Sequence, residues 1–354
     1  MEKIESVLAG RALANQSFER WIPRQCDEKW IALVSDAPKF GWDTQAIQKG
    51  LIDPLYGEFT SQPERWRPIL AANLIWEAGL DAAEFSPLLA AIELCYLSFV
   101  TIRNLRNSLT AAEALPNQGT VSFPILVTVS YTARQLALTL VFSHAGMLRP
   151  DSRSWLGYRF GRVLIQMGVG GAVDMLKAEK GMKSDGERRY LDHLKLAVSP
   201  LTFTIAADTA IAAIGLIGTP EGDQLQQAAS HLGIAYNLVT EILLLKERRN
   251  PSGKAFQDLL PHWSYAAAMG CCAEGGIRRV SASNGPALEK EGDLSEGRMQ
   301  KALIQKALTA ARKQMDQMEF SLKNVRKGLA GAYESFSETA VLPKIRALEE
   351  GMDA

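Results

Sequence analysis

Two arginines and two asparagines stand together at residues 103–107, where the chain reads RNLRN. Guanidinium groups bind phosphate and carboxylate through pairs of parallel hydrogen bonds, and they remain charged at every physiological pH. This cluster could therefore hold an anionic head group. Glu241 offers a carboxylate in a later segment, and Asn237 precedes it by about one helical turn. We expect Asn237 and Glu241 to lie on one side of a helix.

Histidine and cysteine add few further candidates for chemistry. His262, in the sequence PHWSY, could exchange a proton near neutral pH, and a structural role is the competing interpretation. The other histidines have no partner at the spacing of metal ligands: His144, His193 and His231. The four cysteines form no CxxC pair, so we expect reduced thiols and no zinc site.

Composition narrows the class of protein. The 354 residues include 39 Lys and Arg and 39 Asp and Glu, so no global basic field favours nucleic acid. The N-terminal residues lack a long apolar core, which predicts no secretory signal and a cytoplasmic protein. Residues 196–218 carry only Asp208 as a charge and are nearly long enough to span a bilayer. Because Pro200 and Asp208 interrupt this stretch, we expect a buried core helix and no membrane span.

The elements that position these residues are predicted to be helices. Apolar residues recur at spacings of three and four, and alternating patterns typical of strands are scarce. Ser86 followed by Pro87 predicts an N-cap and the start of a long helix. Small and charged residues at 281–295 predict a mobile surface loop. The fold class is therefore all-α, with one domain over residues 1–354. The predicted helices cover residues 1–15, 54–80 with a restart near Arg67-Pro68, 86–109, 122–147, 152–181, 185–217, 221–248, 255–277, and 296–327 with a continuation to about 349.

Five short stretches occur in an order and spacing typical of one enzyme family. They are residues 93–102 followed by RNLRN, residues 170–174, residues 190–198, residues 233–244, and Gly253-Lys254 with Asp258-Leu259 and Pro261. Over about residues 65–265 the chain resembles the trans-isoprenyl diphosphate synthases. The resemblance implies an isoprenoid-synthase-type helical bundle around a central apolar cavity.

The resemblance also shows what has been replaced. Members of this family hold magnesium between two clusters of the form DDxxD, and the metal neutralises a diphosphate leaving group. Here the first cluster is RNLRN, and the second keeps only Glu241, beside Thr240, with Leu244 in the last acidic position. Magnesium prefers several hard oxygen ligands, and one carboxylate facing two arginines is a poor set. We therefore expect no metal site and no cofactor, magnesium included.

The resemblance implies a set of site residues. Glu241 and His262 are the candidate acid and base groups. The candidate ligand-binding residues are Arg103, Asn104, Arg106, Asn107, Asn237, Thr240, Tyr96, Phe99, Asp174 and Arg67. Arg103 and Arg106 have two interpretations, an anion site or an ion pair between Arg103 and Glu241 that seals the cavity, and we favour the ion pair. Core packing explains Tyr96 and Phe99, and a buried hydrogen bond explains Asp174, as alternatives.

Three functions follow from this pattern. The first is a repurposed enzyme that binds a prenyl or other hydrophobic chain and promotes transfer, cyclisation or rearrangement without magnesium. The second is a catalytically silent subunit that pairs with an active prenyl synthase and modulates it. The third is a carrier of a hydrophobic ligand. The replacement of most acidic positions, with arginines inserted, favours the enzyme over the subunit. A homodimer, or a heterodimer with a prenyl synthase, is expected.

Overall fold

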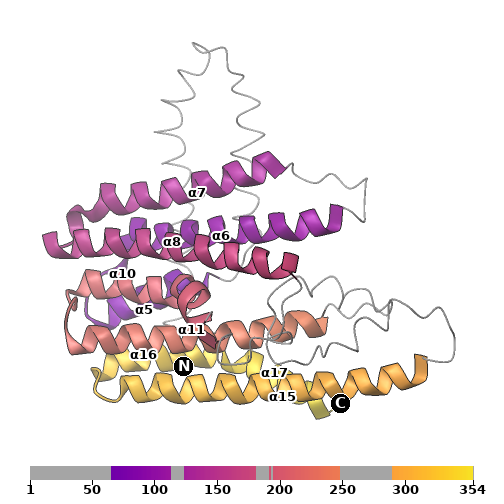
Figure 1. Cartoon of the computed structure of the whole chain (residues 1–354). Helices are drawn as coiled ribbons and strands as arrows, with labels where there is room; N and C mark the ends of the chain where they lie inside the picture. The colour runs from indigo at the N-terminus through magenta and orange to yellow at the C-terminus, as the bar shows by residue number, and fades with distance from the viewer. Residues whose placement is uncertain (1–64, 113–122, 181–190, 193, 248–288, 354) are drawn as a thin grey trace, which may run out of the picture. The chain divides into compact units, whose positions relative to one another are not determined.

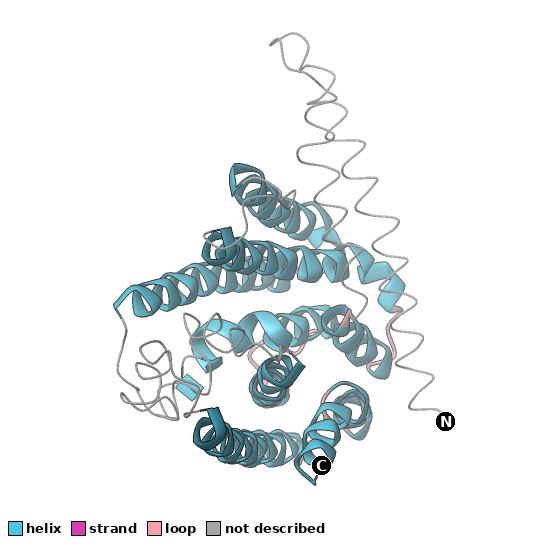
Figure 2. Ribbon diagram, turned by 90° about the vertical axis from the view of Figure 1, so that its right-hand side faces the viewer, coloured by secondary structure: helices cyan, strands magenta, loops and turns pink. Residues whose placement is uncertain are grey.

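Helices make up the part of the chain that the structure describes. The structure, a computed structural model, describes residues 65–112, 123–180, 191–192, 194–247 and 289–353 (Figure 1). Helices joined by loops, and no strands, occur in these ranges (Figure 2), which confirms the all-α prediction. The main helices are α5 (Trp66–Glu77), α6 (Ser86–Ala112), α7 (Phe123–His144), α8 (Pro150–Lys180), α10 (Ile205–Ile214), α11 (Pro220–Glu247), α15 (Glu289–Leu322), α16 (Lys327–Ala340) and α17 (Leu342–Asp353).

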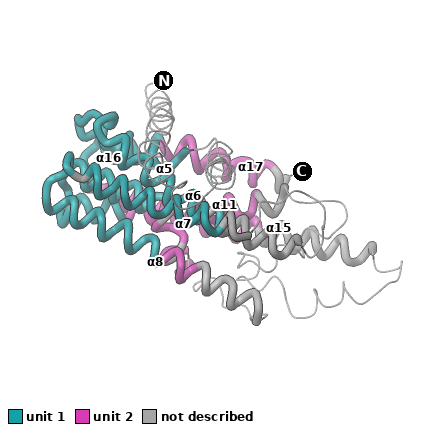
Figure 3. The backbone as a smooth tube through the Cα atoms, turned by 90° about the horizontal axis from the view of Figure 1, so that it is seen from above, with its two compact units in different colours: residues 1–165, 201–226, 325–335 teal, residues 166–200, 227–324, 336–354 magenta. Residues whose placement is uncertain are grey.

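The chain forms two compact units that alternate along the sequence (Figure 3). Unit 1 comprises Met1–Ile165, Leu201–Gln226 and Val325–Ser335, and unit 2 comprises Gln166–Pro200, Gln227–Asn324 and Phe336–Ala354. Because each unit draws on three separate segments, neither corresponds to a contiguous stretch of sequence. The single domain over residues 1–354 and the central apolar cavity stay predictions.

The core of unit 1 is built on α5, α6 and α10. Every residue of α5 from Arg67 to Ile75 is buried, and so is every residue of α10 from Ile205 to Ala212. Helices that are buried on all sides occur in the centre of a large core. Helix α10 packs against α5 and α6, and α6 packs along α7. The expectation of a buried core helix within residues 196–218 is thus confirmed for α10.

The start of α6 differs in one detail from the prediction. The N–H of Gly79 donates to the carbonyl of Trp76 at 2.8 Å, and the positive φ of Gly79 (80°) ends α5. Asp81 then accepts a hydrogen bond from the N–H of Ala83 at 2.9 Å and caps a 3-10 turn that leads directly into α6. Helix α6 begins at Ser86 as predicted. Ser86 already has helical dihedral angles, so Asp81, and not Ser86, is the capping residue.

The helix predicted over residues 185–217 is shorter and less regular than expected. Two π-helical turns, Leu194–Val198 and Pro200–Thr204, precede α10, which ends where Gly215 adopts a positive φ of 76°. A π-helical turn contains one more residue per hydrogen-bonded turn than an α-helix, and such turns are frequent at functional sites. Residues 185–190, where this predicted helix starts, lie outside the described ranges.

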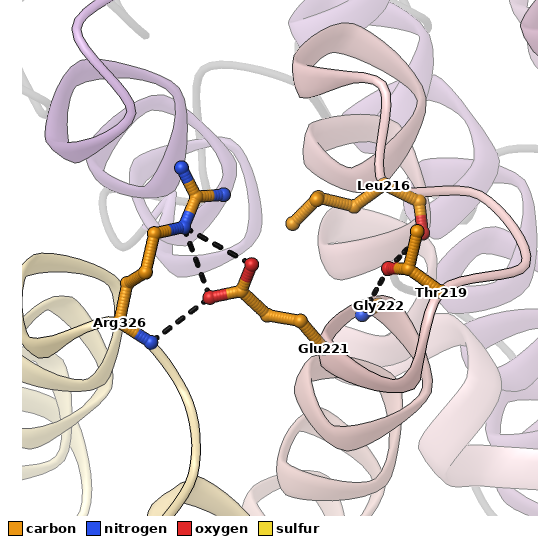
Figure 4. Close-up of polar contacts among 5 residues, drawn as sticks. All are labelled: Leu216, Thr219, Glu221, Gly222 and Arg326. Carbon is orange, nitrogen blue, oxygen red and sulfur yellow. Dashed lines mark hydrogen bonds and ion pairs between the residues drawn. The ribbon is translucent and has the colours of Figure 1, made fainter.

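A polar contact fixes the start of α16 beside the start of α11 in unit 1 (Figure 4). The carboxylate of Glu221, in the first turn of α11, accepts hydrogen bonds from the backbone N–H and the Nε of Arg326, the residue before α16, at 2.9 and 3.0 Å. Directly before α11, the hydroxyl of Thr219 accepts a hydrogen bond from the N–H of Gly222 and donates to the carbonyl of Leu216. Side chains thus occupy the backbone groups that helix ends leave unpaired.

In unit 2, α15 begins earlier than predicted. Helix α15 starts at Glu289, so residues 289–295 are helical and do not belong to the predicted mobile loop. The segment starts with Glu289, Lys290 and Glu291, which are good helix formers, and these outweigh Gly292. Residues 281–288, the rest of the predicted loop, and the predicted helix at 255–277 lie outside the described ranges. Helix α15 packs against α17.

One stretch among the described residues, Ala82–Phe99, is long and apolar enough to cross a membrane. Its residues belong to the core of unit 1, since 78% of the stretch is buried in the structure. The other apolar helical stretch, Thr202–Ile214, is shorter than a membrane span.

Candidate functional site

The arginine and asparagine cluster lies in the second half of α6. Its four polar residues have a helical backbone, and their side chains lie outside the described part of the chain. The positions of Tyr96, Phe99 and Arg103 follow the helical spacing of three and four, which places them on one side of α6. Tyr96 and Phe99 are both half-buried. The predicted anion site therefore continues a side of α6 that begins with two aromatic residues.

Arg67 contacts one of these aromatic residues. Its guanidinium carbon lies 3.1 Å from the centre of the Tyr96 ring, well within the range of a cation–π interaction. Its Nη1 lies 3.7 Å from Oε1 of Glu93, one turn before Tyr96. The side chains of Arg67 and Glu93 are 6% and 5% exposed. Burial raises the pKa of Glu93, and the positive charge of Arg67 opposes this effect.

This buried cluster retains unused hydrogen-bonding capacity. The 3.7 Å separation is too long for a hydrogen bond, and neither Arg67 Nε nor Glu93 Oε1 has a hydrogen-bond partner in the structure. The sequence analysis predicted that Arg67 and Tyr96 both contact a ligand. The structure brings the two residues together and places the Arg67 cation on the face of Tyr96. Their contact with a ligand stays a prediction.

The second group of predicted residues lies on α11, in unit 2. Asn237 donates a hydrogen bond from Nδ2 to the carbonyl of Gly233 at 2.6 Å, one turn earlier. The hydroxyl oxygen of Thr240 is buried and has no hydrogen-bond partner. Glu241 is half-buried on the next position of the helix. Burying an unsatisfied hydroxyl is costly, so a polar group bound beside Thr240 would recover part of that cost.

Close packing fixes α11 against the residues after the first π-helical turn. The hydroxyl of Ser199 donates to the carbonyl of Ser230 at 2.8 Å. A Cβ atom at Gly233 would lie only 2.7 Å from that hydroxyl oxygen. A larger residue at Gly233 would therefore push Ser199 away from α11. This contact explains why a glycine stands four residues before Asn237, because the approach of Ser199 needs the space.

Three further predictions fall on residues that the structure does not describe. Asp174 lies within α8, but its side chain is outside the described part. His262 is outside it as well. The ion pair between Arg103 and Glu241 remains untested because the side chain of Arg103 is not described.

Sequence reasoning missed a buried ion pair in unit 1. Asp208 on α10 is fully buried, and its Oδ2 accepts a hydrogen bond from Nε of Arg159 on α8 at 2.7 Å. Its Oδ1 accepts one from Nε2 of Gln226 on α11 at 2.6 Å. Burial raises the pKa of Asp208, while Arg159 and Gln226 act in the opposite direction. The sequence did contain a signal for this ion pair, because Asp208 is the lone acidic residue in an apolar helix and therefore requires a buried partner.

The donor atoms at the two predicted signature positions do not fit a magnesium cluster. The first position supplies guanidinium and amide groups, and the second supplies one carboxylate, Glu241, beside the hydroxyl of Thr240. Among the described side chains, no group of three or more His, Cys, Asp or Glu residues lies together. Arginine cannot ligate a cation and would repel it. We therefore assign no chemical step to a metal.

Comparison with known proteins identifies the fold. No family model matches the sequence, and no curated protein matches it. Solved structures do match. Farnesyl diphosphate synthase from T. brucei has a TM-score of 0.65 at 12% identity and covers 93% of this chain and 99% of its own. Geranylgeranyl pyrophosphate synthetase from the archaeon Geoglobus acetivorans has a TM-score of 0.61 at 16% identity, covering 87% and 95%.

Geranylgeranyl pyrophosphate synthetase from Pyrococcus horikoshii Ot3 has a TM-score of 0.62 at 17% identity and covers 93% of this chain and 97% of its own. These matches extend over nearly the whole of each solved chain. At such low identity they establish the fold alone. The chain has the all-α fold of the trans-prenyl diphosphate synthases, as the resemblance implied.

Proposed function

We propose that the chain binds a prenyl diphosphate, or a similar hydrophobic chain with an anionic head, and promotes its transfer, cyclisation or rearrangement without a magnesium cluster. The proposal is supported by the prenyl synthase fold, together with the sequence RNLRN at residues 103–107, where the resemblance predicts the first acidic cluster. Two guanidinium groups would supply fixed positive charge where related enzymes rely on metal ions.

The proposed step uses this charge on the leaving group. The carbon–oxygen bond of the allylic diphosphate breaks, and its electron pair leaves with the diphosphate, whose charge Arg103 and Arg106 stabilise. The π electrons of a double bond, in the same chain or in a second molecule, then form a bond to the allylic cation. Loss of a proton to Glu241 or His262 restores a neutral alkene.

The phenol ring of Tyr96 supports this proposal indirectly. It already holds a cation, the guanidinium of Arg67, on its face. An aromatic face that binds one cation can stabilise another in the same place if Arg67 moves away. The half-buried ring of Phe99, on the same side of α6, is a second candidate. These contacts would act on the hydrocarbon end, and the arginines on the anionic end.

The test is a turnover assay with the purified full chain. Geranyl, farnesyl and geranylgeranyl diphosphate are incubated singly and with isopentenyl diphosphate, in EDTA or in magnesium chloride. We expect organic product and free diphosphate in EDTA, and a large loss of both in Arg103→Ala and Arg106→Ala. The control is Arg346→Ala, which removes an exposed arginine on α17. Turnover that requires magnesium would refute the metal-free mechanism.

Two other results would replace the enzyme proposal. Prenyl diphosphate binding without turnover would make the chain a carrier. The chain would be a silent subunit if it neither binds nor turns over prenyl diphosphates and if its co-expression with an active prenyl synthase alters the length of that enzyme's product. The Arg103→Ala variant separates its two roles: loss of ligand affinity at unchanged melting temperature indicates an anion site, whereas a lowered melting temperature indicates the ion pair with Glu241.

A further inference from the structure

His231 lies where three elements of unit 2 meet. Its Nδ1 lies 2.8 Å from Oε1 of Gln314, and this contact joins α11 to α15. The residue before it, Ser230, accepts a hydrogen bond from Ser199, which directly follows the π-helical turn Leu194–Val198. One turn of α11 is therefore held by two elements, by α15 through His231 and by the π-helical segment through Ser199.

The contact with Gln314 determines which ring nitrogen of His231 carries the proton. An amide oxygen accepts hydrogen bonds and does not donate them, so Nδ1 is the donor and bears the proton in the neutral ring. Gln314 is buried, so its side chain depends on this partner more than an exposed amide would. A second proton would bind at Nε2 and would place a full positive charge on a half-buried ring.

The described surroundings of the ring offer little to stabilise that charge. The residues one helical turn from Gln314 on α15 are uncharged: Ala310, Ala311, Gln317 and Met318. The residues one turn from His231 on α11 are uncharged as well: Gln227, Ala228, Ile234 and Ala235. The charged residues closest to Gln314 in the sequence are exposed: Arg312, Lys313 and Asp316. The charged group that acts on the imidazole is Lys195, on the π-helical turn, and it is positive.

These surroundings set the direction in which pH acts. Burial lowers the pKa of His231, the hydrogen bond to Gln314 opposes this effect, and the charge of Lys195 adds to it. Because Lys195 is exposed, water and salt screen part of its repulsion, and burial of the ring is the larger cause. The unfolded chain, where a histidine has its ordinary pKa of 6.5, therefore binds a proton more readily. The stability that neutral His231 contributes is present above pH 6.5 and is lost as the pH falls through the lowered pKa.

We propose that His231 is a pH-sensitive latch, which holds α11 to α15 as the neutral imidazole and releases this contact when the ring gains a proton. A charged ring is better solvated in water than half-buried beside Lys195, so it turns outward and leaves Gln314 without its partner. The π-helical turn opens with it, because Ser199 packs closely on the same turn of α11 at Ser230 and Gly233. This inference does not depend on whether the chain is catalytic.

The first test follows the four histidine rings of the full chain by nuclear magnetic resonance as the pH is lowered. The signal that His231→Asn removes should titrate with a midpoint below 6.5. Lys195→Gln should raise this midpoint because it removes a positive charge, and Gln314→Leu should lower it because it removes an acceptor that favours the charged ring. The control is Lys306→Gln, which removes an exposed lysine of α15 and should leave the midpoint unchanged. A midpoint at or above 6.5, or shifts of the opposite sign, would overturn the latch.

The second test measures opening by hydrogen exchange and mass spectrometry, with rates corrected for the intrinsic effect of pH. Exchange of the backbone amides at residues 194–199 and 310–318 should accelerate by up to about tenfold per pH unit below 6.5 and level off below the lowered pKa. The matched variant is His231→Asn, whose amide can donate to Gln314 and cannot gain a charge, and whose helix propensity is close to that of histidine. Its corrected rates should not change with pH. Equal acceleration in the wild type and in His231→Asn, or acceleration in neither, would show that His231 is no latch.

Discussion

Removing either member of the Asp208–Arg159 pair should strongly destabilise unit 1. Both oxygens of the Asp208 carboxylate accept hydrogen bonds, at 2.7 Å from Arg159 and 2.6 Å from Gln226, and its side chain is 0% exposed. Breaking a buried ion pair by removing one partner costs about 3–5 kcal/mol, because the remaining charge is left uncompensated. The Arg159 side chain retains 16% exposure, so water can partly solvate it when Asp208 is removed.

The two single variants should therefore differ. Arg159→Met leaves a fully buried carboxylate with one neutral partner, and we expect a loss at the upper end, about 4–5 kcal/mol at neutral pH. Asp208→Asn leaves only the partly solvated Arg159, and we expect about 3 kcal/mol. In the double variant neither charge remains, so its loss should be smaller than the sum of the two by about 2 kcal/mol or more.

The dependence on pH gives an independent check. Burial raises the pKa of Asp208 and Arg159 opposes this, so removal of Arg159 should raise that pKa further. The folded state of Arg159→Met then binds a proton more readily than the unfolded chain. The penalty should be fully present above the raised pKa and should shrink as the pH falls through it towards the ordinary value of 3.8.

Urea denaturation followed by circular dichroism and by tryptophan fluorescence measures these differences. The control is Arg312→Met, which breaks the exposed pair between Arg312 and Glu349, where the arginine side chain is 62% exposed. It should cost at most about 1 kcal/mol. The assignment of a buried, coupled network would be refuted if each single variant lost less than about 1 kcal/mol of stability and if the two losses were additive in the double variant.

Two further predictions concern the start of α11 (Figure 4). Glu221→Gln should lower the free energy of unfolding by about 1 kcal/mol, because it weakens the hydrogen bonds to Arg326. Desolvation acts to raise the pKa of Glu221, but the bonds to Arg326 lower it overall, so the stability that Glu221 contributes should be present above the ordinary pKa of 4.5 and lost as the pH falls through the lowered pKa. Urea denaturation at a series of acid pH values, in which the stabilities of wild type and variant never converge, would contradict this. Gly222→Ala should destabilise the protein by about 1–3 kcal/mol, because the added Cβ would overlap the carbonyl oxygen of Leu216. The control is Gly161→Ala, where a Cβ would have nothing within 4 Å and should stabilise α8 by about 0.5–1 kcal/mol. Thermal melts that rank the two variants in the opposite order would disprove the close approach of Leu216 to Gly222.

Local sequence signals predicted the helices whose amphipathic or apolar pattern is regular. The spacing of apolar residues gave α7, α8 and α11 nearly to their ends, and Ser86 marked the first residue of α6. Such signals are local, because a helix forms hydrogen bonds within its own segment. The five family-like stretches added the fold class, which the solved structures then matched along nearly their whole length.

Features that depend on a neighbouring helix could not be predicted in this way. The two π-helical turns before α10 read as one regular helix, because apolar spacing alone does not distinguish the two geometries. Arg67 was expected to face a ligand, and only the packing of α5 on α6 placed it over Tyr96 beside Glu93. The sequence also gave no reason to connect Thr240 with a missing hydrogen bond.

The sequence by itself determined that this protein is helical and that it resembles prenyl diphosphate synthases, and it predicts that arginines stand in place of the acids of the first signature. Those properties follow from residue types and spacing along one segment. Only the tertiary structure decided that Asp208 pairs with Arg159, 49 residues away, and that Tyr131 and Phe142 on α7 are exposed. Pairing and exposure are set by what lies opposite in space, because the cost of burying a charge or exposing an aromatic ring depends on that neighbour.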